Sequence, residues 1–312
     1  MRKSVVAHIW SVERDSMIFR DLFGRFIDSG QRFEHVSWVR ADEGEADFRI
    51  YHRPQLEGSL ARPCACVVHH DLTDPSDDHS VETGIARYRE SDLVICLNRG
   101  QARYLEAHGV SGLTVIPHGY DAALPEIARR RAPRRDGPFR LGLFSRRYPR
   151  LVKGEAFLYE LAMRLDPGLF EFVLLGRDRD KDAAFLQQLG FRTHCNTAPA
   201  YAEILEAYRS IDALLVLSVA EGGPASVPEA VAVGVPVVGR AVGMIPDLVP
   251  DPDRILLLTD NAPEDAARIE AYFRSGLHTT VSGLDRQPSI RPWAQTVAEY
   301  EAAIAGIPGV PG

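Results

Sequence analysis

Two acids, Glu221 and Glu229, stand on either side of a glycine-containing segment in the second half of the chain. The apolar run 214–218 before them predicts a buried strand, and Ser226 with Glu229 fits the Ser-x-x-Glu pattern at a helix start. A helix N-terminus carries a positive partial charge suited to a phosphate, and carboxylates accept hydrogen bonds from hydroxyl groups. The alternative is that Glu229 only caps the helix through Ser226 and that Glu221 is a loop carboxylate.

Two further clusters contain groups that can do chemistry. Arg146, Arg147 and Lys153 follow a strand-like run and could neutralise a phosphate; the alternative is a solvated basic loop. His69 and His70, followed by Asp71, end another apolar run. For these we consider a place near a reaction centre, a structural His–Asp hydrogen bond, or a metal site, although the spacing matches no standard metal site.

Apolar strand-like runs alternate with helix-period segments along almost the whole chain, which is typical of a parallel-sheet α/β protein. The predicted strands are 4–10, 34–39, 48–51, 64–69, 93–97, 113–117, 139–145, 170–175, 191–194, 213–218, 236–239 and 255–258. The predicted helices are 15–27, 81–90, 100–107, 154–165, 182–189, 201–210, 227–233, 263–274 and 292–304. The segment 121–138, rich in Arg, Ala and Pro and without clean periodicity, is the predicted linker.

Composition narrows the class of protein. A chain of 312 residues suits two domains, and 45% apolar with 25% charged residues is an ordinary globular balance. The net charge of −7 argues against nucleic acid as the main partner, no apolar run is long enough to span a membrane, and the N-terminus does not fit a signal peptide. The four cysteines are expected to be reduced core thiols. Of the basic cluster 129–135 we expect either a solvated segment or contact with anionic lipid or a charged acceptor.

The Glu-x7-Glu spacing with the following Ala230–Val238 resembles the signature of retaining glycosyltransferases of the GT-B fold, family 4 type (glycosyl transferases group 1). This resemblance implies that Glu221 contacts hydroxyls of the donor sugar and that Glu229 contacts the ribose of its nucleotide. It places the donor among the residues from the first acid to the second, namely Gly222, Gly223, Pro224, Ala225 and Ser226.

Three other segments resemble elements of the same family. Ile116–Asp121 is similar to the family's Ile-Pro-Asn-Gly-x-Asp element, with His118 in place of Asn. Phe144–Gly154 resembles its phosphate clamp, which implies Lys153 as a catalytic cation. Arg147 is favoured as the second cation because its separation from the lysine is closer to the family's, and Arg146 is the alternative.

The resemblance extends less clearly to the remaining site positions. His194 lies where the family meets the nucleotide base, and His69 or His70 lies where a residue commonly faces the reacting sugar. Only one of these two neighbours is expected to point into the cleft. The glycine-rich loop usual after the first strand is missing from 10–17, where Arg14 or Ser16 stands instead.

The resemblance implies an α/β protein of GT-B fold, with two Rossmann-like domains facing a central cleft. We expect residues 1–125 to form an acceptor-binding domain, 126–290 a nucleotide-sugar donor-binding domain, and 291–312 a helix that returns to the first. The implied reaction moves a sugar from a nucleoside-diphosphate sugar to an acceptor hydroxyl with retention of configuration, in glycan, glycolipid or natural-product biosynthesis.

The expected donor carries UDP or GDP, no cofactor or metal is required, and the acceptor is a glycan, a lipid-linked molecule or a small molecule. We expect the protein to be cytoplasmic. The other option is peripheral contact with the inner face of the membrane. The alternatives are a sugar-nucleotide epimerase or hydrolase of the same fold, and a catalytically inactive protein that binds nucleotide sugars.

Overall fold

The computed structural model describes residues 4–8, 24–26, 35–39, 48–74, 81–130, 137–248, 253–276, 289–308 and 310. The chain forms two compact units. Unit 1 comprises Met1–Gly119 together with Arg291–Gly312, and unit 2 comprises Tyr120–Ile290. The expectations for residues 10–17, including Arg14 and Ser16, lie outside the described residues.

Unit 1 contains a parallel sheet in the strand order β2-β1-β3-β4-β5-β6. Its strands are β1 Ser4–His8, β2 His35–Val39, β3 Phe48–Tyr51, β4 Cys64–Val68, β5 Leu93–Cys96 and β6 Leu113–Val115. The first five strands follow the flavodoxin-like order, in which the chain changes direction between β1 and β3.

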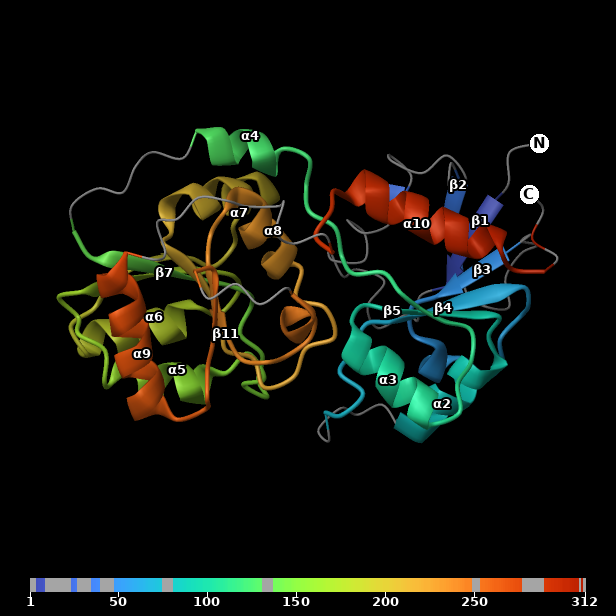
Figure 1. Ribbon diagram of the computed structural model, residues 1–312, viewed down its shortest axis with the longest axis horizontal. Helices are drawn as coiled ribbons and strands as arrows, with labels where there is room; N and C mark the ends of the chain where they lie inside the picture. Colours follow the sequence, from blue (N-terminus) through green and yellow to red (C-terminus); the bar gives the residue numbers. More distant parts are fainter. Residues whose placement is uncertain are drawn as a thin grey trace. The chain divides into compact units, whose positions relative to one another are not determined.

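Side chains of the fully buried strand β4 alternate between two cores. Ala65 and Val67 join a cluster that includes α10 (Trp293–Ala305), while Cys64, Cys66 and Val68 join a cluster with α2 (Val81–Glu90) and α3 (Arg99–Ala107). The last helix of the chain therefore packs on one face of this sheet and the two central helices on the other, as Figure 1 shows.

Unit 2 contains a second parallel sheet, in the order β12-β11-β10-β7-β8-β9. Its strands are β7 Phe139–Phe144, β8 Phe170–Leu175, β9 Arg192–Asn196, β10 Ala213–Val216, β11 Val237–Gly239 and β12 Ile255–Leu257. Counted from the first strand of the unit, this is the Rossmann order 3-2-1-4-5-6, and β7 and β10 are the neighbours at which the strand order reverses.

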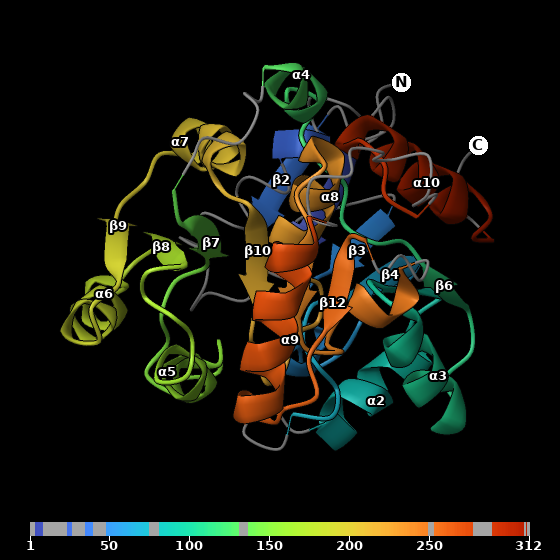
Figure 2. The same ribbon diagram turned by 60° about the vertical axis from the view of Figure 1, so that its left-hand side comes forward.

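Helices cover both faces of the second sheet. One core contains α5 (Glu155–Ala162), α6 (Asp180–Gln188) and α9 (Ala262–Ser275), and the other contains α4 (Leu124–Arg129), α7 (Tyr201–Ala207) and α8 (Ser226–Val233). Figure 2 shows β9, β8, β7 and β10 side by side, with α7 on one side and α5 and α6 on the other. Doubly wound sheets of this kind bind ligands beyond the carboxyl ends of their strands.

The segment predicted as a linker is partly helical. The sequence predicts a linker without periodicity over residues 121–138, but this segment contains α4, whose Leu124 and Ile127 are buried in a core of unit 2. Because the helix has only six residues, two apolar side chains are enough to anchor it, which is too few to produce a periodic pattern. None of the described helices is long and apolar enough to cross a membrane.

Candidate functional site

The loops after β7 and β10 meet at the point where the strand order of unit 2 reverses. The two strands are paired in parallel, so their carboxyl ends lie at the same edge of the sheet. The backbone N–H of Val219, in the loop after β10, donates a hydrogen bond of 3.0 Å to the carbonyl of Val152, in the loop after β7. Backbone atoms alone therefore hold the two loops together.

Gly154 makes this close approach possible. It stands at the N-cap of α5 with φ of +79°, a conformation that favours glycine, and an added Cβ would lie 1.9 Å from the carbonyl oxygen of Leu217. Any other residue would drive the loop after β7 away from the end of β10. The glycine thereby fixes the position of the preceding residue, Lys153.

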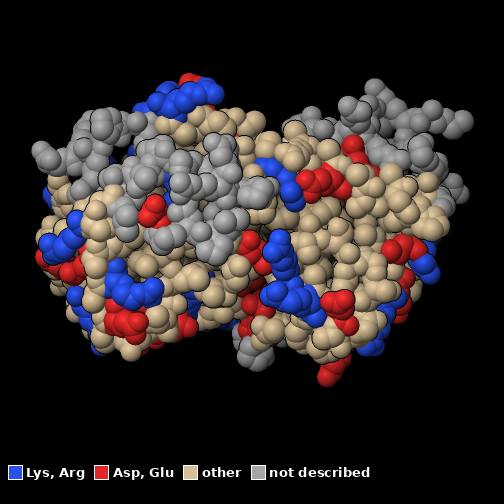
Figure 3. Space-filling model, in the orientation of Figure 1, with Lys and Arg blue, Asp and Glu red and all other residues tan. Residues whose placement is uncertain are grey.

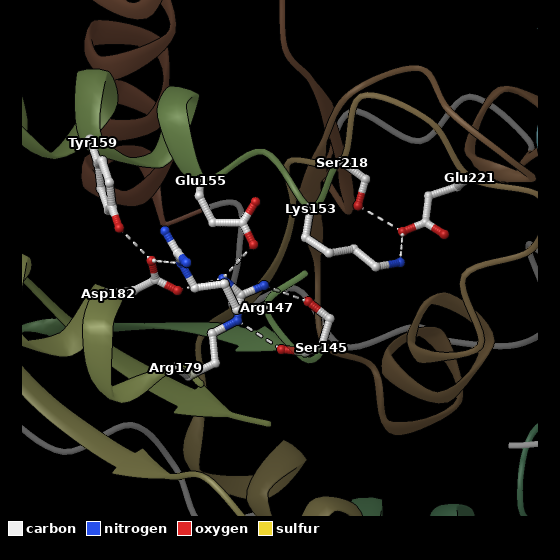
Figure 4. Close-up of polar contacts among 9 residues, drawn as sticks. All are labelled: Ser145, Arg147, Lys153, Glu155, Tyr159, Arg179, Asp182, Ser218 and Glu221. Carbon is white, nitrogen blue, oxygen red and sulfur yellow. Dashed lines mark hydrogen bonds and ion pairs between the residues drawn. The ribbon is translucent and has the colours of Figure 1, made fainter. Parts of the chain in front are cut away.

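Lys153 and Glu221 form an ion pair across the two loops. Nζ of the lysine lies 2.5 Å from Oε1 of the glutamate, and the same oxygen accepts a 2.6 Å hydrogen bond from Oγ of Ser218. The three side chains lie together in Figure 4. They line a small pocket, here called the switch-point pocket, together with Ser145, Pro224, Ser226 and residues from the ends of β7 and β10.

The two arginines after β7 point to different partners. Arg147 is half-buried, and its Nε lies 3.3 Å from Oδ1 of Asp182. Arg146 is exposed, and its guanidinium carbon lies 3.9 Å from the centre of the Tyr148 ring. Lys153 Nζ approaches the same ring at 5.6 Å, so Arg146 and Lys153 share one aromatic neighbour whereas Arg147 is bonded to α6.

A fully buried arginine holds the loop that carries these cations. Arg179 donates to the carbonyl and the hydroxyl of Ser145 at 2.7 and 2.8 Å, and pairs with Asp182 at 2.6 Å and with Glu155 at 3.2 Å (Figure 4). Asp182 also accepts a 2.6 Å hydrogen bond from Tyr159. Burial, followed by the contact with Asp182, raises the pKa of this tyrosine to about 12, which keeps it a hydrogen-bond donor.

Glu229 is held by two tyrosines rather than by a helix cap. Ala225 is the N-cap of α8, without a side-chain cap hydrogen bond, and Ser226 is the first helical residue, so the predicted capping box is wrong. The carboxylate of Glu229 accepts hydrogen bonds from Tyr201 at 2.7 Å and Tyr208 at 2.9 Å. Burial and the neighbouring Glu229 raise the pKa of Tyr208 well above its usual value, so this ring also remains a donor.

The segment between the two glutamates packs on a glycine from a later turn. Gly223 and Pro224 belong to the turn before α8, and an added Cβ at Gly243 would lie 2.6 Å from Pro224 Cδ and 3.3 Å from Glu221 Cβ. Gly243 has φ of +55°. Residues 221–226 are thus supported by a backbone that has no room for a side chain.

Unit 1 carries a group of histidines at the carboxyl ends of its strands. Nδ1 of His52, just after β3, lies 2.6 Å from Nε2 of His69, just after β4. The His69 ring stacks at 6.1 Å on His118, which in turn lies 5.5 Å from Trp293 at the start of α10. His69 therefore lies on the face of the sheet that α10 covers. Strand alternation predicts this, because Ala65 and Val67 lie on the same face.

Burial keeps these imidazoles neutral near pH 7. It lowers the pKa of His52 to about 3 and that of His118 to about 4, and it places the pKa of His69 well below the usual value. The backbone carbonyl of His70 accepts a 2.9 Å hydrogen bond from Gln101. No cluster of three or more His, Cys, Asp or Glu among the described residues has a metal-binding arrangement.

Comparison with known proteins shows what the second unit is similar to. Residues 139–273 match the family model described as glycosyl transferases group 1. The match covers β7 to α9, less than half of the chain, and contains the switch-point pocket. No curated protein matches the sequence.

Solved glycosyltransferase structures share the fold of the whole chain. HepE from Anabaena, in complex with UDP and glucose, has a TM-score of 0.73 at 17% identity, covering 97% of this chain and 100% of that one. Sucrose-phosphate synthase from Thermosynechococcus elongatus gives 0.68 at 15% identity over 97% of both chains. A glycosyltransferase from Rickettsia africae gives 0.68 at 11% identity over 98% of this chain and 99% of that one. The fold is GT-B, as the sequence predicted.

Within the segment that matches the family model, some of the predicted site residues lie together and others do not. Lys153, Glu221, Pro224 and Ser226 line one pocket, with Gly222, Gly223 and Ala225 in the connecting turn. His194 is exposed, and its Nε2 lies 3.6 Å from Glu171 on the neighbouring strand β8, away from the residues that line the pocket.

Several residues of this network were missed by sequence reasoning. Tyr201 and Tyr208, which hold Glu229, come seven residues apart on one helical segment, a spacing that could have shown them to share a face. Arg179 and Asp182 lie in a charged helix start that reads as solvated, so only the structure reveals that both are buried.

The structure describes only part of the basic cluster 129–135, which belongs to unit 2. Arg129 pairs with Glu126, and Arg130 pairs with Glu206 at 2.8 Å. Figure 3 shows Lys and Arg side chains at the top left, over α4. The remaining arginines of the cluster, 131, 134 and 135, lie outside the described residues.

Proposed function

We propose that the protein is a glycosyltransferase that takes a sugar from a nucleoside-diphosphate sugar, with UDP or GDP as the nucleotide. The observation that carries the proposal is the pairing of Lys153 with Glu221 in the switch-point pocket. A cation for phosphate and an acid for hydroxyl groups stand side by side, at the edge where a doubly wound sheet binds nucleotides. The match of residues 139–273 to glycosyl transferases group 1 supports the same conclusion.

In this proposal Lys153 and Arg146 bind the diphosphate. Both cations approach the Tyr148 ring, whereas Arg147 is bonded to the buried Asp182 and serves to fix the loop. We therefore assign the second phosphate contact to Arg146, although residue spacing favours Arg147. Glu221 accepts hydrogen bonds from the sugar, and Glu229, fixed by two tyrosines, accepts them from the ribose.

We propose that transfer retains the anomeric configuration. The bond between the sugar's anomeric carbon and the phosphate oxygen breaks, and its electron pair stays on the phosphate. The acceptor oxygen then bonds to the same face of the sugar and gives its proton to the departing phosphate. Lys153 and Arg146 stabilise the charge that develops on that phosphate, as fixed cations do best where charge appears in the transition state.

We assign acceptor binding to unit 1, which carries His69 and His70 at the end of β4. The carboxyl ends of parallel strands are where such sheets bind ligands, and His69 is held there by His52. A neutral imidazole can both donate and accept a hydrogen bond, so His69 suits a hydroxyl group. The acceptor is a glycan, a lipid-linked molecule or a small molecule, and peripheral membrane contact through Arg129 and Arg130 would suit a lipid-linked one.

Consumption of sugar nucleotide with and without acceptor tests the function. Lys153→Ala should reduce transfer by at least about 100-fold, the usual effect of losing one charge-stabilising group. Lys181→Ala, which removes an exposed lysine of the same unit, should leave transfer unchanged. Equal rates for Lys153→Ala and the parent protein would refute the clamp, and a new sugar nucleotide or free sugar formed equally well without acceptor would identify an epimerase or hydrolase instead.

A further inference from the structure

The ion pair in the switch-point pocket joins two groups that need different ligands. Lys153 Nζ and Glu221 Oε1 lie 2.5 Å apart, and Ser218 donates to the same oxygen at 2.6 Å. The lysine side chain is 18% exposed and that of the glutamate 12% exposed. Because both are largely shielded from water, they interact more strongly than an ion pair on the surface.

A nucleoside diphosphate by itself satisfies only half of this pair. Its phosphate oxygens must draw Lys153 away from Glu221, and they offer no donor to replace the lysine at that carboxylate, which can only accept hydrogen bonds. The intact sugar nucleotide also brings hydroxyl groups, which donate to that carboxylate. The glutamate therefore opposes the binding of the diphosphate alone and favours the diphosphate that carries a sugar.

We propose that the Lys153–Glu221 pair makes the pocket select the intact sugar nucleotide over the free nucleoside diphosphate. Glu221 is then a specificity-determining residue that acts partly through the lysine, in addition to its contact with the sugar. This inference rests on the proposed function of the pocket. Its consequence is that the nucleoside diphosphate left after transfer leaves readily, because Lys153 returns to Glu221 when the sugar has gone.

Isothermal titration calorimetry of the full chain with two matched pairs of ligands tests the inference. The pairs are UDP with UDP-glucose and GDP with GDP-mannose, and the pair that the parent protein binds is carried forward. Glu221→Gln keeps the shape of the side chain and removes its charge. We expect the nucleoside diphosphate to bind about tenfold more tightly to this variant, a factor that corresponds to about 1.4 kcal/mol.

The sugar nucleotide should not share this gain, because the variant loses a charge-assisted hydrogen bond to the sugar. The ratio of the two dissociation constants should therefore fall by about tenfold or more. Glu206→Gln makes the same chemical change in a surface ion pair of unit 2 and should change neither constant.

A double-mutant cycle separates the ion pair from simple repulsion between Glu221 and phosphate. In a Lys153→Ala background, Glu221→Gln should change the affinity for the nucleoside diphosphate by less than about twofold, because no ammonium group is released. Equal tightening with and without Lys153, or no tightening in Glu221→Gln alone, would overturn the inference. Failure of the parent protein to bind any of the four ligands would instead refute the proposed function, and the inference with it.

Discussion

Replacing Gly154 with alanine tests whether the close contact of two loops builds the switch-point pocket. An alanine Cβ at this position would lie 1.9 Å from the carbonyl oxygen and 2.5 Å from the carbonyl carbon of Leu217. Non-bonded heavy atoms prefer separations of roughly 3.5 Å or more, so the loop after β7 must move by about 1.5 Å. Lys153, the preceding residue, moves with it.

Two effects add up in this variant. Placing alanine at a φ of +79° costs about 1 kcal/mol, and crowding in a well-packed region typically costs about 1–3 kcal/mol more. We expect a total loss of about 2–4 kcal/mol. For a unit of this size each kcal/mol lowers Tm by roughly 2–4 °C, so Tm should fall by roughly 5–15 °C.

Gly276→Ala is the matched control. Gly276 has φ of +76°, almost the same as Gly154, but apart from its own chain neighbours no heavy atom of the described residues lies within 4 Å of the position that an alanine Cβ would occupy there. It should show only the backbone cost of about 1 kcal/mol. Thermal unfolding of both variants, together with sugar-nucleotide affinity, measures the difference. If Gly154→Ala is no less stable than Gly276→Ala and binds the donor normally, the contact between the loops does not build the pocket.

Three further changes separate roles that the structure assigns to individual side chains. Arg146→Ala should weaken sugar-nucleotide binding by about tenfold with little change in Tm. Arg147→Ala should instead lower the stability of the protein by about 1–2 kcal/mol, because Asp182 loses a partner. The reverse pattern would assign the phosphate contact to Arg147. Tyr208→Phe should weaken sugar-nucleotide binding several-fold because Glu229 loses one of its two tyrosine hydrogen bonds, and calorimetry that finds no change would separate Glu229 from the nucleotide. Burial lowers the pKa of His52 in the folded state to about 3, whereas its pKa in the unfolded state is about 6.5. Below about pH 6.5, protonation of this histidine therefore favours the unfolded state, and each pH unit lowers the free energy of unfolding by about 1.4 kcal/mol. His52→Asn should therefore reduce the loss of stability between about pH 6 and about pH 4, as measured by denaturant unfolding, and an unchanged pH profile would contradict the burial of this ring.

Much of unit 2 could be predicted from local sequence pattern. The predicted strand 170–175 coincides with β8, and helix 227–233 begins one residue after the start of α8. Such elements are recognisable because a buried strand is a short apolar run between turn residues. Lys153 and Glu221 are candidates through their resemblance to the phosphate clamp and the Glu-x7-Glu signature of a known family, and both follow strands at whose carboxyl ends parallel sheets bind ligands.

Side-chain direction within the loops could not be predicted in the same way. Arg146 and Arg147 are neighbours of the same type, and residue counting cannot show that one lies on the Tyr148 ring while the other reaches Asp182. Arg179 gives no signal either, because an arginine in a charged segment normally lies at the surface. Its burial depends on two carboxylates, Glu155 and Asp182, that come from different helices.

The same limit applies to Glu229. The Ser-x-x-Glu spacing predicts a capping box, yet tyrosines from the segment 201–208 bind the carboxylate instead. Local spacing describes contacts along one helix, and here contacts from another helical segment replace them. Because a capped helix and a held carboxylate give the same sequence, only the tertiary structure distinguishes the two.

A thermal-shift comparison of sugar nucleotides tests most directly whether the switch-point pocket is a donor site. UDP-glucose, GDP-mannose, an ADP-sugar and a TDP-sugar are each added at increasing concentration to the parent protein and to Lys153→Ala. A ligand that binds the folded state raises stability in proportion to the logarithm of its concentration over Kd, by about 2.7 kcal/mol at about 100 times Kd. We predict that one of these nucleotides raises the Tm of the parent protein in this way and that Lys153→Ala largely abolishes the shift. An equal shift in both proteins, or no shift with any of them, would contradict a donor site at Lys153 and Glu221.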